Sequence, residues 1–361
     1  MLVIAIADHG QLSYLVEGIQ VMRTSERVGY AVVGLGFISE FAILPAFGHS
    51  QNARLLAVVS GDRNKARRLA RQFGAPHTHT YDDYTLCLNR PEIEAVYIAT
   101  HPGTHAPLAV QAAAAGKHVL CEKPMAATSE QCQQMVDACR ANGVRLMIAY
   151  RKYFEPASLE LKRLVSRGKL GQLRLIHSAF SMTLDKKARA WHFDPKLAGG
   201  GSLFDLGVYC VNTVRWLTGK EPTEAAAYTW AVHPDVFCEV EENIAFRLVF
   251  PDGLVCQAST SFSAAMASFL HLHGEKGWAA LTPAFTFHEE RRLFGDLGGE
   301  RFEKKFQVLD EFALELDAFA DCIRGNRDPE PNGLQGLHDV AVMEAIYRSA
   351  RANCPVAINL S

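Results

Sequence analysis

The sequence contains no apolar run that approaches the ~18–20 residues needed to span a membrane. Residues 1–21 lack a basic start and are interrupted by Asp8, His9 and Gly10, so they do not have the pattern of a secretory signal. An excess of one charge is also missing, since 37 Lys and Arg residues stand against 39 Asp and Glu residues and the net charge is −2. Such a chain has no overall field to hold a polyanion or an anionic membrane surface. We therefore expect a cytoplasmic protein with neither nucleic acid nor membrane as a partner.

Cysteine pairs are missing as well. The nine cysteines are scattered singly, without a C-x-x-C pair of the kind that binds zinc or carries out redox chemistry. The histidines give no better ligand set, because a proline and a glycine separate His101 from His105, and the pair His271 and His273 has no third ligand nearby. We expect reduced, mostly buried thiols and no metal.

The remaining composition is that of an ordinary globular chain. With 361 residues, 48% of them hydrophobic and 21% charged, the chain can bury a sizeable core and is longer than one core usually serves. We expect two domains, residues 23–150 and 151–361, after an N-terminal extension, residues 1–22. That extension is either a helical arm or an over-extended start, with Met22 as the true first residue.

The first domain has the rhythm of an α/β fold. Apolar runs of strand length alternate with helical patterns, and strands buried on both faces between helices predict a doubly wound parallel sheet of the Rossmann type. The expected strands are Val28–Val33, Arg54–Ser60, Ala95–Ala99, His118–Cys121 and Arg145–Ala149, and the expected helices are Asn64–Phe73, His105–Ala115 and Ser129–Ala141.

After Tyr150 the pattern changes to an α+β one. Partly alternating runs with Gly and Pro between them predict an open, mainly antiparallel sheet with flanking helices. The expected strands are Gln172–Ser181, Glu242–Phe250, Leu254–Ser261, Leu270–Gly274 and Trp278–Leu281, and the expected helices are Ala157–Ser166, about Ser202 to Leu217, Glu311–Ile323 and Leu337–Arg351.

A glycine turn follows the first strand. Gly34-x-Gly36-x-x-Ser39 opens a helical segment, where bare backbone lets a pyrophosphate approach and helix N–H groups face its charge. Ser39 stands where a third glycine normally permits close packing of helix and strand, and serine is a small substitute. The spacing predicts a dinucleotide site at Gly34, Gly36, Phe37 and Ile38, with a plain tight turn as the alternative.

The end of the second strand bears on the choice of dinucleotide. A carboxylate there accepts from the ribose 2′-hydroxyl of NAD and repels the 2′-phosphate of NADP. Here Ser60 and Gly61 are followed by Arg63 and Lys65, and a hydroxyl with two cations favours the phosphate. Asp62 opposes this, although we interpret it as the N-cap of the following helix. We expect NADP as the cofactor, with NAD as the alternative.

A lysine stands at the end of another predicted strand. Cys121-Glu122-Lys123-Pro124 lies at the carboxyl edge along which open α/β sheets bind their ligands. Pro124 disfavours a helical conformation at Lys123, which helps to hold this residue extended. Without these neighbours the lysine would be interpreted as a surface residue at a strand end.

A polar stripe interrupts the apolar helix that follows Ala198-Gly-Gly-Gly201. Asp205, Tyr209 and Asn212 fall at i, i+4 and i+7, which places them on one face of a helix and suggests a lined cavity. Ser202 and Asp205 also fit a capping box, so Asp205 has a structural alternative.

With these motifs the chain resembles the superfamily of glucose–fructose oxidoreductase, inositol dehydrogenase and rhizopine-catabolism proteins. The resemblance covers about residues 27 to 357 and is carried by Glu122-Lys-Pro124, by the Gly-Gly-Gly-Ser-x-x-Asp-x-Gly segment and by Gly336-Leu-His-Asp339 with Ala345-Ile-x-x-Ser-Ala350. Tyr209, where many members have histidine, and the pair Tyr150-Arg151 resemble the NADP-using, sugar-oxidising glucose–fructose oxidoreductase branch. The twin-arginine signal and proline-rich arm of its exported namesakes are not seen, so we expect a freely exchanging cofactor.

The resemblance implies roles for individual residues. It assigns catalysis to Lys123, Asp205 and Tyr209. Our hypothesis is that Tyr209 takes the hydroxyl proton while Lys123 holds the sugar oxygen and favours the phenolate by its charge. Asp205 is expected to tune this pair or to bind a sugar hydroxyl. It assigns to the cofactor cleft Thr100, His101, Pro102, His105, Glu122 and Lys123. Arg151 is expected to contact a sugar hydroxyl or to be a surface charge, and Trp191 to stack on a sugar face or to anchor the core.

The implied activity is oxidation of an aldose at C1. The alternatives with the same site are reduction of a keto- or anhydro-sugar and oxidation of a dihydrodiol. A sugar or NADP sensor is a further alternative, which the retention of Lys123, Asp205 and Tyr209 together disfavours. Family likeness and apolar residues on both sides of the second sheet's strands also suggest a homodimer or homotetramer formed through that sheet.

Overall fold

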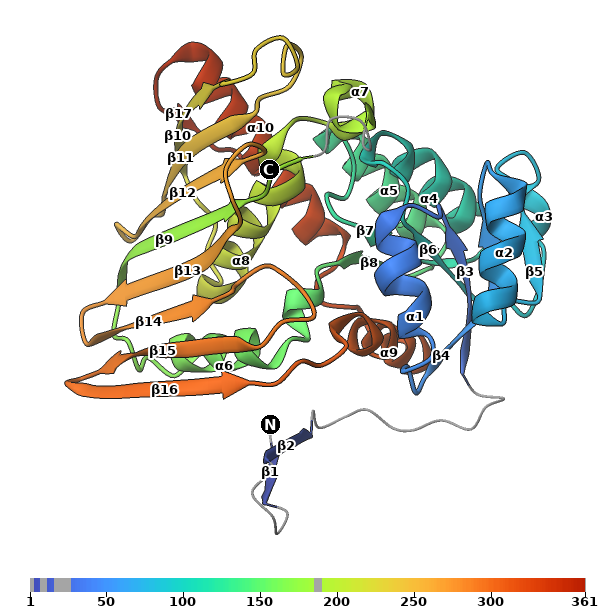
Figure 1. Cartoon of the computed structure of the whole chain (residues 1–361), viewed down its shortest axis with the longest axis horizontal. Coiled ribbons are helices and arrows are strands. Elements are labelled where there is room, and N and C mark those ends of the chain that lie inside the picture. Colours follow the sequence, from blue (N-terminus) through green and yellow to red (C-terminus); the bar gives the residue numbers. More distant parts are fainter. Residues whose placement is uncertain (1–2, 7–11, 16–26, 185–189, 361) are drawn as a thin grey trace.

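The computed structural model describes residues 3–6, 12–15, 27–184 and 190–360. Two helix-covered sheets lie beside each other, and a hairpin of two short strands, β1 (Val3–Ile6) and β2 (Leu12–Leu15), precedes them (Figure 1). The helical arm considered for residues 1–21 is therefore wrong for the described part of that stretch. Val3, Ile4 and Ile6 are β-branched, which favours the strand. Residues 1–2, 7–11 and 16–26 lie outside the described residues.

The first sheet confirms the predicted parallel, doubly wound architecture. Its order is β5-β4-β3-β6-β7-β8, and all its pairs are parallel. The strands are β3 (Val28–Val33), β4 (Ala53–Val59), β5 (His77–His79), β6 (Ala95–Ile98), β7 (His118–Glu122) and β8 (Leu146–Ala149). The helices of this region are a π-helical segment (Ser39–Ile43), α1 (Leu44–Ala46), α2 (Arg63–Phe73), α3 (Tyr84–Leu88), α4 (His105–Ala114) and α5 (Ser129–Ala141). Strand β5 and helix α3 were not predicted, since each is only three to five residues long.

The second sheet confirms the mainly antiparallel prediction. Its order is β16-β15-β14-β13-β9-β12-β11-β10-β17, and β9 and β12 form a parallel pair at its centre. The strands are β9 (Leu173–Ser181), β10 (Glu224–Trp230), β11 (Asn243–Val249), β12 (Val255–Ser261), β13 (Ala267–Gly274), β14 (Gly277–Thr282), β15 (Arg291–Leu297), β16 (Glu300–Phe306) and β17 (Val356–Ala357).

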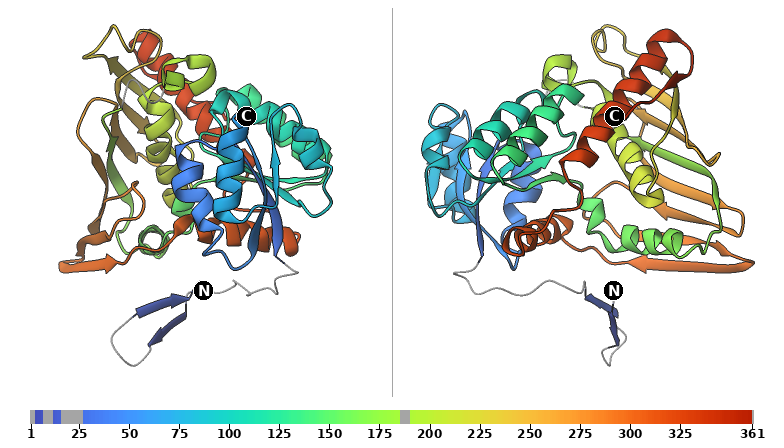
Figure 2. Two further views of the ribbon diagram at one scale, coloured as in Figure 1. Left: turned by 45° about the vertical axis from the view of Figure 1, so that its right-hand side comes forward. Right: turned by 180° about the vertical axis from the view of Figure 1, so that it is seen from behind.

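Helices cover one face of the second sheet, as both views in Figure 2 show. These are α6 (Pro156–Ser166), α8 (Val208–Thr218) and α10 (Gly333–Ala352). Helix α9 (Glu311–Arg324) behaves differently, because Phe312, Leu316 and Phe319 are buried against strands of the first sheet. The chain thus returns from the second sheet to complete the first core. None of the described helices is both long and apolar enough to cross a membrane.

Candidate active site

The glycine turn after β3 is shaped for close approach. Gly34 has a φ of +94°, and a Cβ on it would lie 2.6 Å from the Ala99 carbonyl oxygen, so only glycine fits. A Cβ on Gly36 would meet no atom within 4 Å, so the backbone there faces open space. Ser39, fully buried, donates from Oγ to the Gly34 carbonyl oxygen at 2.6 Å. The serine in place of the third glycine therefore ties the turn to its helix.

These features fit a bound dinucleotide. Bare backbone at Gly36, directly before a helical segment, is the arrangement that receives a pyrophosphate. Of the two residues predicted beside it, Ile38 is half-buried and Phe37 is 54% exposed, its ring 4.8 Å from that of Phe41. Gly34, Gly36, Phe37 and Ile38 would hold the phosphate part of the cofactor.

The segment after β4 is arranged around Asp62. Its Oδ1 accepts from the backbone N–H groups of Asn64 and Lys65 at 2.9 and 3.0 Å, which makes it the predicted N-cap of α2. Ser60 is buried, and its Oγ accepts from the Asp62 backbone N–H. Gly61 and Arg63 are exposed, whereas the Lys65 ammonium lies 3.0 Å from the Glu40 carboxylate. The Ser60 hydroxyl therefore lies on this loop, and the cations Arg63 and Lys65 lie in the first turn of α2. There Lys65 is paired with Glu40, and Asp62 is engaged as the cap.

The loop after β6 is fastened by two side chains. Thr104 donates from Oγ1 to Thr100 Oγ1 at 2.9 Å. His105, fully buried at the start of α4, places Nε2 3.1 Å from the Thr100 carbonyl oxygen and Nδ1 3.2 Å from the Pro124 carbonyl oxygen. His101 is half-buried and Pro102 buried. Because a neutral imidazole has one N–H, His105 donates to one of these carbonyl oxygens and packs between the segment around Thr100 and the one that carries Lys123.

Lys123 and Asp205 form the centre of the candidate site. The Lys123 ammonium donates to the Asp205 carbonyl oxygen at 2.8 Å and to its carboxylate at 3.0 Å, and His192 Nε2 lies 3.4 Å from the other carboxylate oxygen. Burial lowers the pKa of Lys123, but Asp205, Tyr209 and Glu122 together outweigh burial and leave it raised. Burial raises the pKa of Asp205, but Lys123 and His192 outweigh burial and leave it well below its usual range. The two groups are therefore an ion pair.

Tyr209 lies against two cations. The Lys123 ammonium is 4.8 Å and the Arg151 guanidinium carbon 5.1 Å from the centroid of its ring. Arg151 is 3% exposed, so it is not a surface charge; it pairs with Glu311 at 2.7 Å and donates to the Phe285 carbonyl oxygen. The structure thus brings the predicted Lys123, Asp205 and Tyr209 together and adds Arg151 beneath the phenol ring.

Two interpretations of the Asp205 helix are wrong. Ser202 makes no capping bond with its side chain; Glu241 instead accepts from the Gly201 and Leu203 backbone N–H groups at 2.9 and 2.7 Å. The capping box is absent from this segment because a carboxylate from another loop supplies the cap.

The second wrong interpretation concerns Asn212, the third residue of the predicted polar stripe, which does not face the site. A π-helical turn, Leu203–Gly207, precedes α8, and Asn212 donates to the buried Asp339 at 2.8 Å instead of lining the site. The wider π turn changes the angular spacing on which the i, i+4, i+7 pattern depends.

Trp191 lies at the edge of the cluster. It is half-buried, stacks on His192 with ring centroids 3.6 Å apart, and lies 6.2 Å from the His101 ring. His192 and Glu311 were not predicted, because their contacts with Asp205 and Arg151 join segments that are distant in sequence. A histidine beside a tryptophan and an acid in a helix's first turn are too common to signal such contacts.

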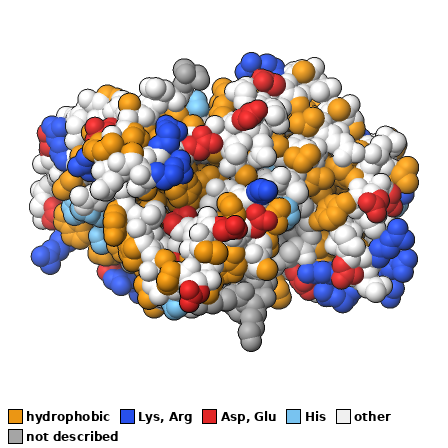
Figure 3. All heavy atoms as spheres, turned by 90° about the horizontal axis from the view of Figure 1, so that it is seen from above, with side chains coloured by type: hydrophobic (Ala, Val, Ile, Leu, Met, Phe, Trp, Pro, Cys, Tyr) orange, Lys and Arg blue, Asp and Glu red, His pale blue; other side chains and the backbone are white. Residues whose placement is uncertain are grey.

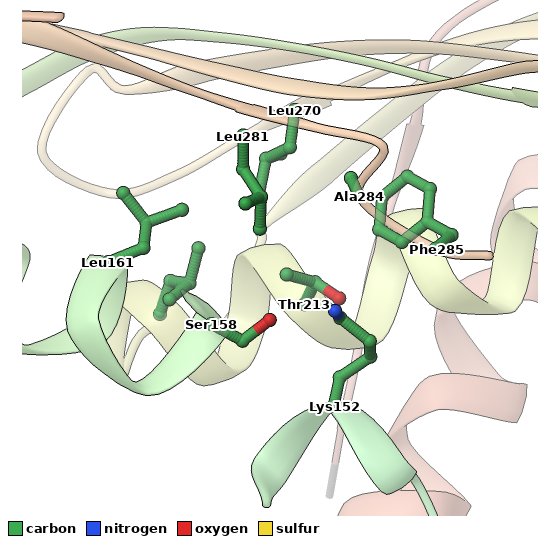
Figure 4. A pocket seen from close by; sticks show the side chains of 9 residues that line it. Lys152, Ser158, Leu161, Thr213, Leu270, Leu281, Ala284 and Phe285 are labelled. Carbon is green, nitrogen blue, oxygen red and sulfur yellow. The ribbon is translucent and has the colours of Figure 1, made fainter. Parts of the chain in front are cut away.

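Neither the face in Figure 3 nor the small space beside Lys152 suggests a competing site. On the face in Figure 3, basic, acidic and apolar groups are interspersed, without a continuous basic patch. Figure 4 shows side chains of α6, α8 and the second sheet, with Lys152, around a space that has no room for a water-sized sphere. That space cannot take a substrate.

Comparison with known proteins identifies the fold family. Residues 28–150 match the family model described as an oxidoreductase family with an NAD-binding Rossmann fold, and residues 158–280 match the GFO/IDH/MocA C-terminal domain. The chain belongs to the GFO/IDH/MocA oxidoreductase family. The resemblance stated from the sequence is thereby confirmed, and the chain is an oxidoreductase with a dinucleotide-binding Rossmann domain.

Three relatives match between 70% and 93% of the chain. The crystal structure of the aldose-aldose oxidoreductase of Caulobacter crescentus is 36% identical, with a TM-score of 0.88 over 92% of this chain and 100% of that one. The NADP-dependent D-xylose 1-dehydrogenase of Haloarcula marismortui is 29% identical over 93% of this chain and 94% of that protein. The trans-1,2-dihydrobenzene-1,2-diol dehydrogenase of Mus musculus is 30% identical over 70% of this chain and 74% of that protein.

Proposed function

We propose that this oxidoreductase oxidises an aldose at C1 with NADP as the hydride acceptor. The observation that carries the proposal is the convergence of Lys123, Asp205 and Tyr209, which come from the two parts of the chain on either side of residue 150. The relatives named for D-xylose and aldose oxidation support the substrate class, and the cations Arg63 and Lys65 after β4 support NADP.

The chain's own groups divide the acid–base work. Tyr209 Oη accepts the proton of the sugar C1 hydroxyl, and Lys123 Nζ donates a hydrogen bond to the same sugar oxygen. Asp205 holds the Lys123 ammonium in place at 3.0 Å. Lys123 and Arg151, both cations against the Tyr209 ring, stabilise the negative charge that the Tyr209 oxygen must carry before it accepts the proton. A bound nicotinamide would supply the hydride acceptor for C1, and the sugar would then leave as a lactone.

A second candidate is oxidation of a dihydrodiol. The mouse dihydrodiol dehydrogenase favours it, and the same proton acceptor would serve a diol hydroxyl. A non-catalytic sugar sensor has no need for the ion pair and the tyrosine, so the intact cluster disfavours that function.

A turnover panel tests the proposal. Purified protein is incubated with NADP⁺ or NAD⁺ and with D-xylose, D-glucose or trans-1,2-dihydrobenzene-1,2-diol, and reduced cofactor and products are measured. Lactone formed with NADP⁺ is the expected result. Turnover of the diol alone would move the function to the second candidate, and binding of a sugar without any turnover would make the protein a sensor.

We further propose that the protein self-associates and is cytoplasmic. Leu175 and Trp278 are 41% and 37% exposed on the second sheet, and no described helix covers the face on which they lie. The nine cysteines are all free, and six of them are buried, as suits a reducing compartment.

A further inference from the structure

A buried row of three polar side chains lies behind Lys123. Tyr97 of β6 places its Oη 3.0 Å from Glu122 Oε1 of β7 and 3.0 Å from Glu315 Oε1 of α9. Tyr97 and Glu315 are fully buried, and Glu122 is 8% exposed. The proposed mechanism uses neither Tyr97 nor Glu315.

The number of hydrogens in this row is limited. A phenol has one O–H hydrogen to donate, and an ionised carboxylate only accepts. With both carboxylates ionised, one of the two 3.0 Å contacts at Tyr97 Oη would hold no hydrogen and would place a buried negative oxygen against a lone pair. One of the two carboxyl groups must therefore carry a proton and donate it to Tyr97.

Glu122 has the better surroundings for a negative charge. Its Oε2 accepts from the Lys123 backbone N–H at 3.1 Å. Burial raises its pKa, and the Lys123 ammonium, the Tyr97 hydroxyl and the Arg151 guanidinium oppose that rise.

Glu315 has fewer stabilising partners. Its Oε2 is buried and has no hydrogen-bond partner among the residues that the structure describes. Burial and the charge of Glu122 raise the pKa of Glu315 well above its usual range, although Tyr97 and Arg151 oppose the rise. The titratable or charged groups that face it are Glu122, Tyr97, Arg151, Glu311 and Tyr30.

We propose that Glu315 carries a proton in the folded protein and donates it to Tyr97 Oη, which makes it a positioning residue for Lys123. The Tyr97 hydroxyl is then directed at Glu122 Oε1, and Glu122 Oε2 accepts from the Lys123 backbone. The row runs from α9 to the residue whose ammonium meets Asp205. Only the consequence for activity rests on the proposed function; the position of the proton does not.

An isosteric amide tests the position of the proton. Glu315→Gln keeps a donor for Tyr97 but cannot be an acid, so the infrared difference spectrum between wild type and variant at neutral pH should show the loss of a protonated-carboxyl carbonyl band. Glu303→Gln on β16, whose carboxylate is 45% exposed, should leave this band unchanged. A wild-type spectrum without the band at Glu315 overturns the inference.

Stability measured against pH gives a second readout. The raised pKa means that the folded state keeps the Glu315 proton when the unfolded state has lost it. This contribution to stability is complete below the ordinary glutamate pKa and is lost as pH rises through the raised value. Glu315→Gln should therefore lose less stability than wild type on going from pH 5 to pH 9. Equal losses in the two proteins would contradict the proposal.

The positioning role is tested by comparing two variants. Glu315→Leu removes the donor and should lower kcat about tenfold, as the loss of one hydrogen bond in the row would, while Glu315→Gln should restore most of it. Equal kcat values for Glu315→Leu and wild type would refute the positioning role. Because the infrared band needs no substrate, a failure of this inference is distinguishable from a failure of the aldose proposal.

Discussion

Three side chains near Lys123 have shifted pKa values because they are buried or paired: His105, Lys123 itself and Asp205. Burial lowers the pKa of His105 to about 4, although the carbonyl oxygens of Thr100, Met125 and Pro124 oppose that change. Lys123 and Asp205 hold each other charged. Each of these effects gives a measurable consequence at the scale of one residue.

His105 should make stability depend on pH. Between about pH 6.5 and about pH 4 the unfolded chain protonates this histidine and the folded chain does not. The difference of about 2.5 units between the unfolded and folded pKa corresponds to about 3 kcal/mol in the free energy of unfolding. The protein has this stability above pH 6.5 and loses it as the pH falls towards 4. Urea unfolding at several pH values should show a flatter dependence for His105→Asn. An unchanged slope in the variant would contradict burial of a neutral imidazole.

Asp205 should act through Lys123. Asp205→Asn removes the charge that holds the ammonium, so kcat should fall about 10²-fold through the misplaced Lys123. Asp137→Asn on α5 is a matched control, because this exposed carboxylate accepts from Gln133 and its loss should leave kcat near wild type. Steady-state kinetics of both variants with the substrate found in the panel measures the effect. Similar kcat values for the two variants would remove Asp205 from the mechanism.

At the scale of elements, helix α9 is the connection that matters most. Glu311 in its first turn pairs with Arg151 at 2.7 Å and also with Arg291 of β15, and all three side chains are at most 4% exposed. The helix therefore holds together the first sheet, the second sheet and the guanidinium beneath Tyr209.

Removing the Glu311 charge should be costly. Glu311→Gln leaves the buried Arg151 guanidinium without its carboxylate and Arg291 with only the more distant Glu155, and breaking a buried pair in this way typically costs about 3–5 kcal/mol. Equilibrium unfolding of this variant should show that loss, whereas Glu303→Gln, which breaks the exposed pair with Arg292, should change stability little. Equal stabilities of the two variants would show that α9 is not fastened in this way.

The elements also show what could be predicted from the sequence. Strands such as β3 and β6 were predicted because every residue in them is buried and apolar runs report that directly. Strand β16 was missed because its sequence, ERFEKKF, is mostly polar and exposed. Helix α9 was predicted, but its packing on the first sheet was not, since an amphipathic pattern does not say which core it faces. In the same way, the helical pattern predicted Asp205 but could not indicate that His192, from another segment, lies beside it.

At the scale of the whole molecule, we expect self-association through the face of the second sheet that no described helix covers. Its rows include Leu175, His273 and Trp278, which are register neighbours on β9, β13 and β14. Such a row, with the exposed apolar side chains of Leu175 and Trp278 in a nine-stranded sheet, suits a second copy of the chain.

A matched pair of leucines tests this interface. Leu175→Glu on the sheet should shift the protein from oligomer towards monomer in analytical ultracentrifugation, because a charge would be buried without a partner. Leu86→Glu on α3, where the leucine is 61% exposed, should leave the mass unchanged. If wild type sediments as a monomer, the sheet is not an interface.

The most direct test of the account is hydride transfer in a single turnover by Tyr209→Phe. With enzyme in excess over NADP⁺ and saturating aldose, the variant should bind both partners but form NADPH about 10²–10⁴-fold more slowly, the usual loss of a positioned acid–base group. Tyr228→Phe, an exposed tyrosine on β10, should keep the wild-type rate. A Tyr209→Phe rate equal to wild type would contradict the assignment of the proton to this phenol, and with it the proposed chemistry of the Lys123, Asp205 and Tyr209 cluster.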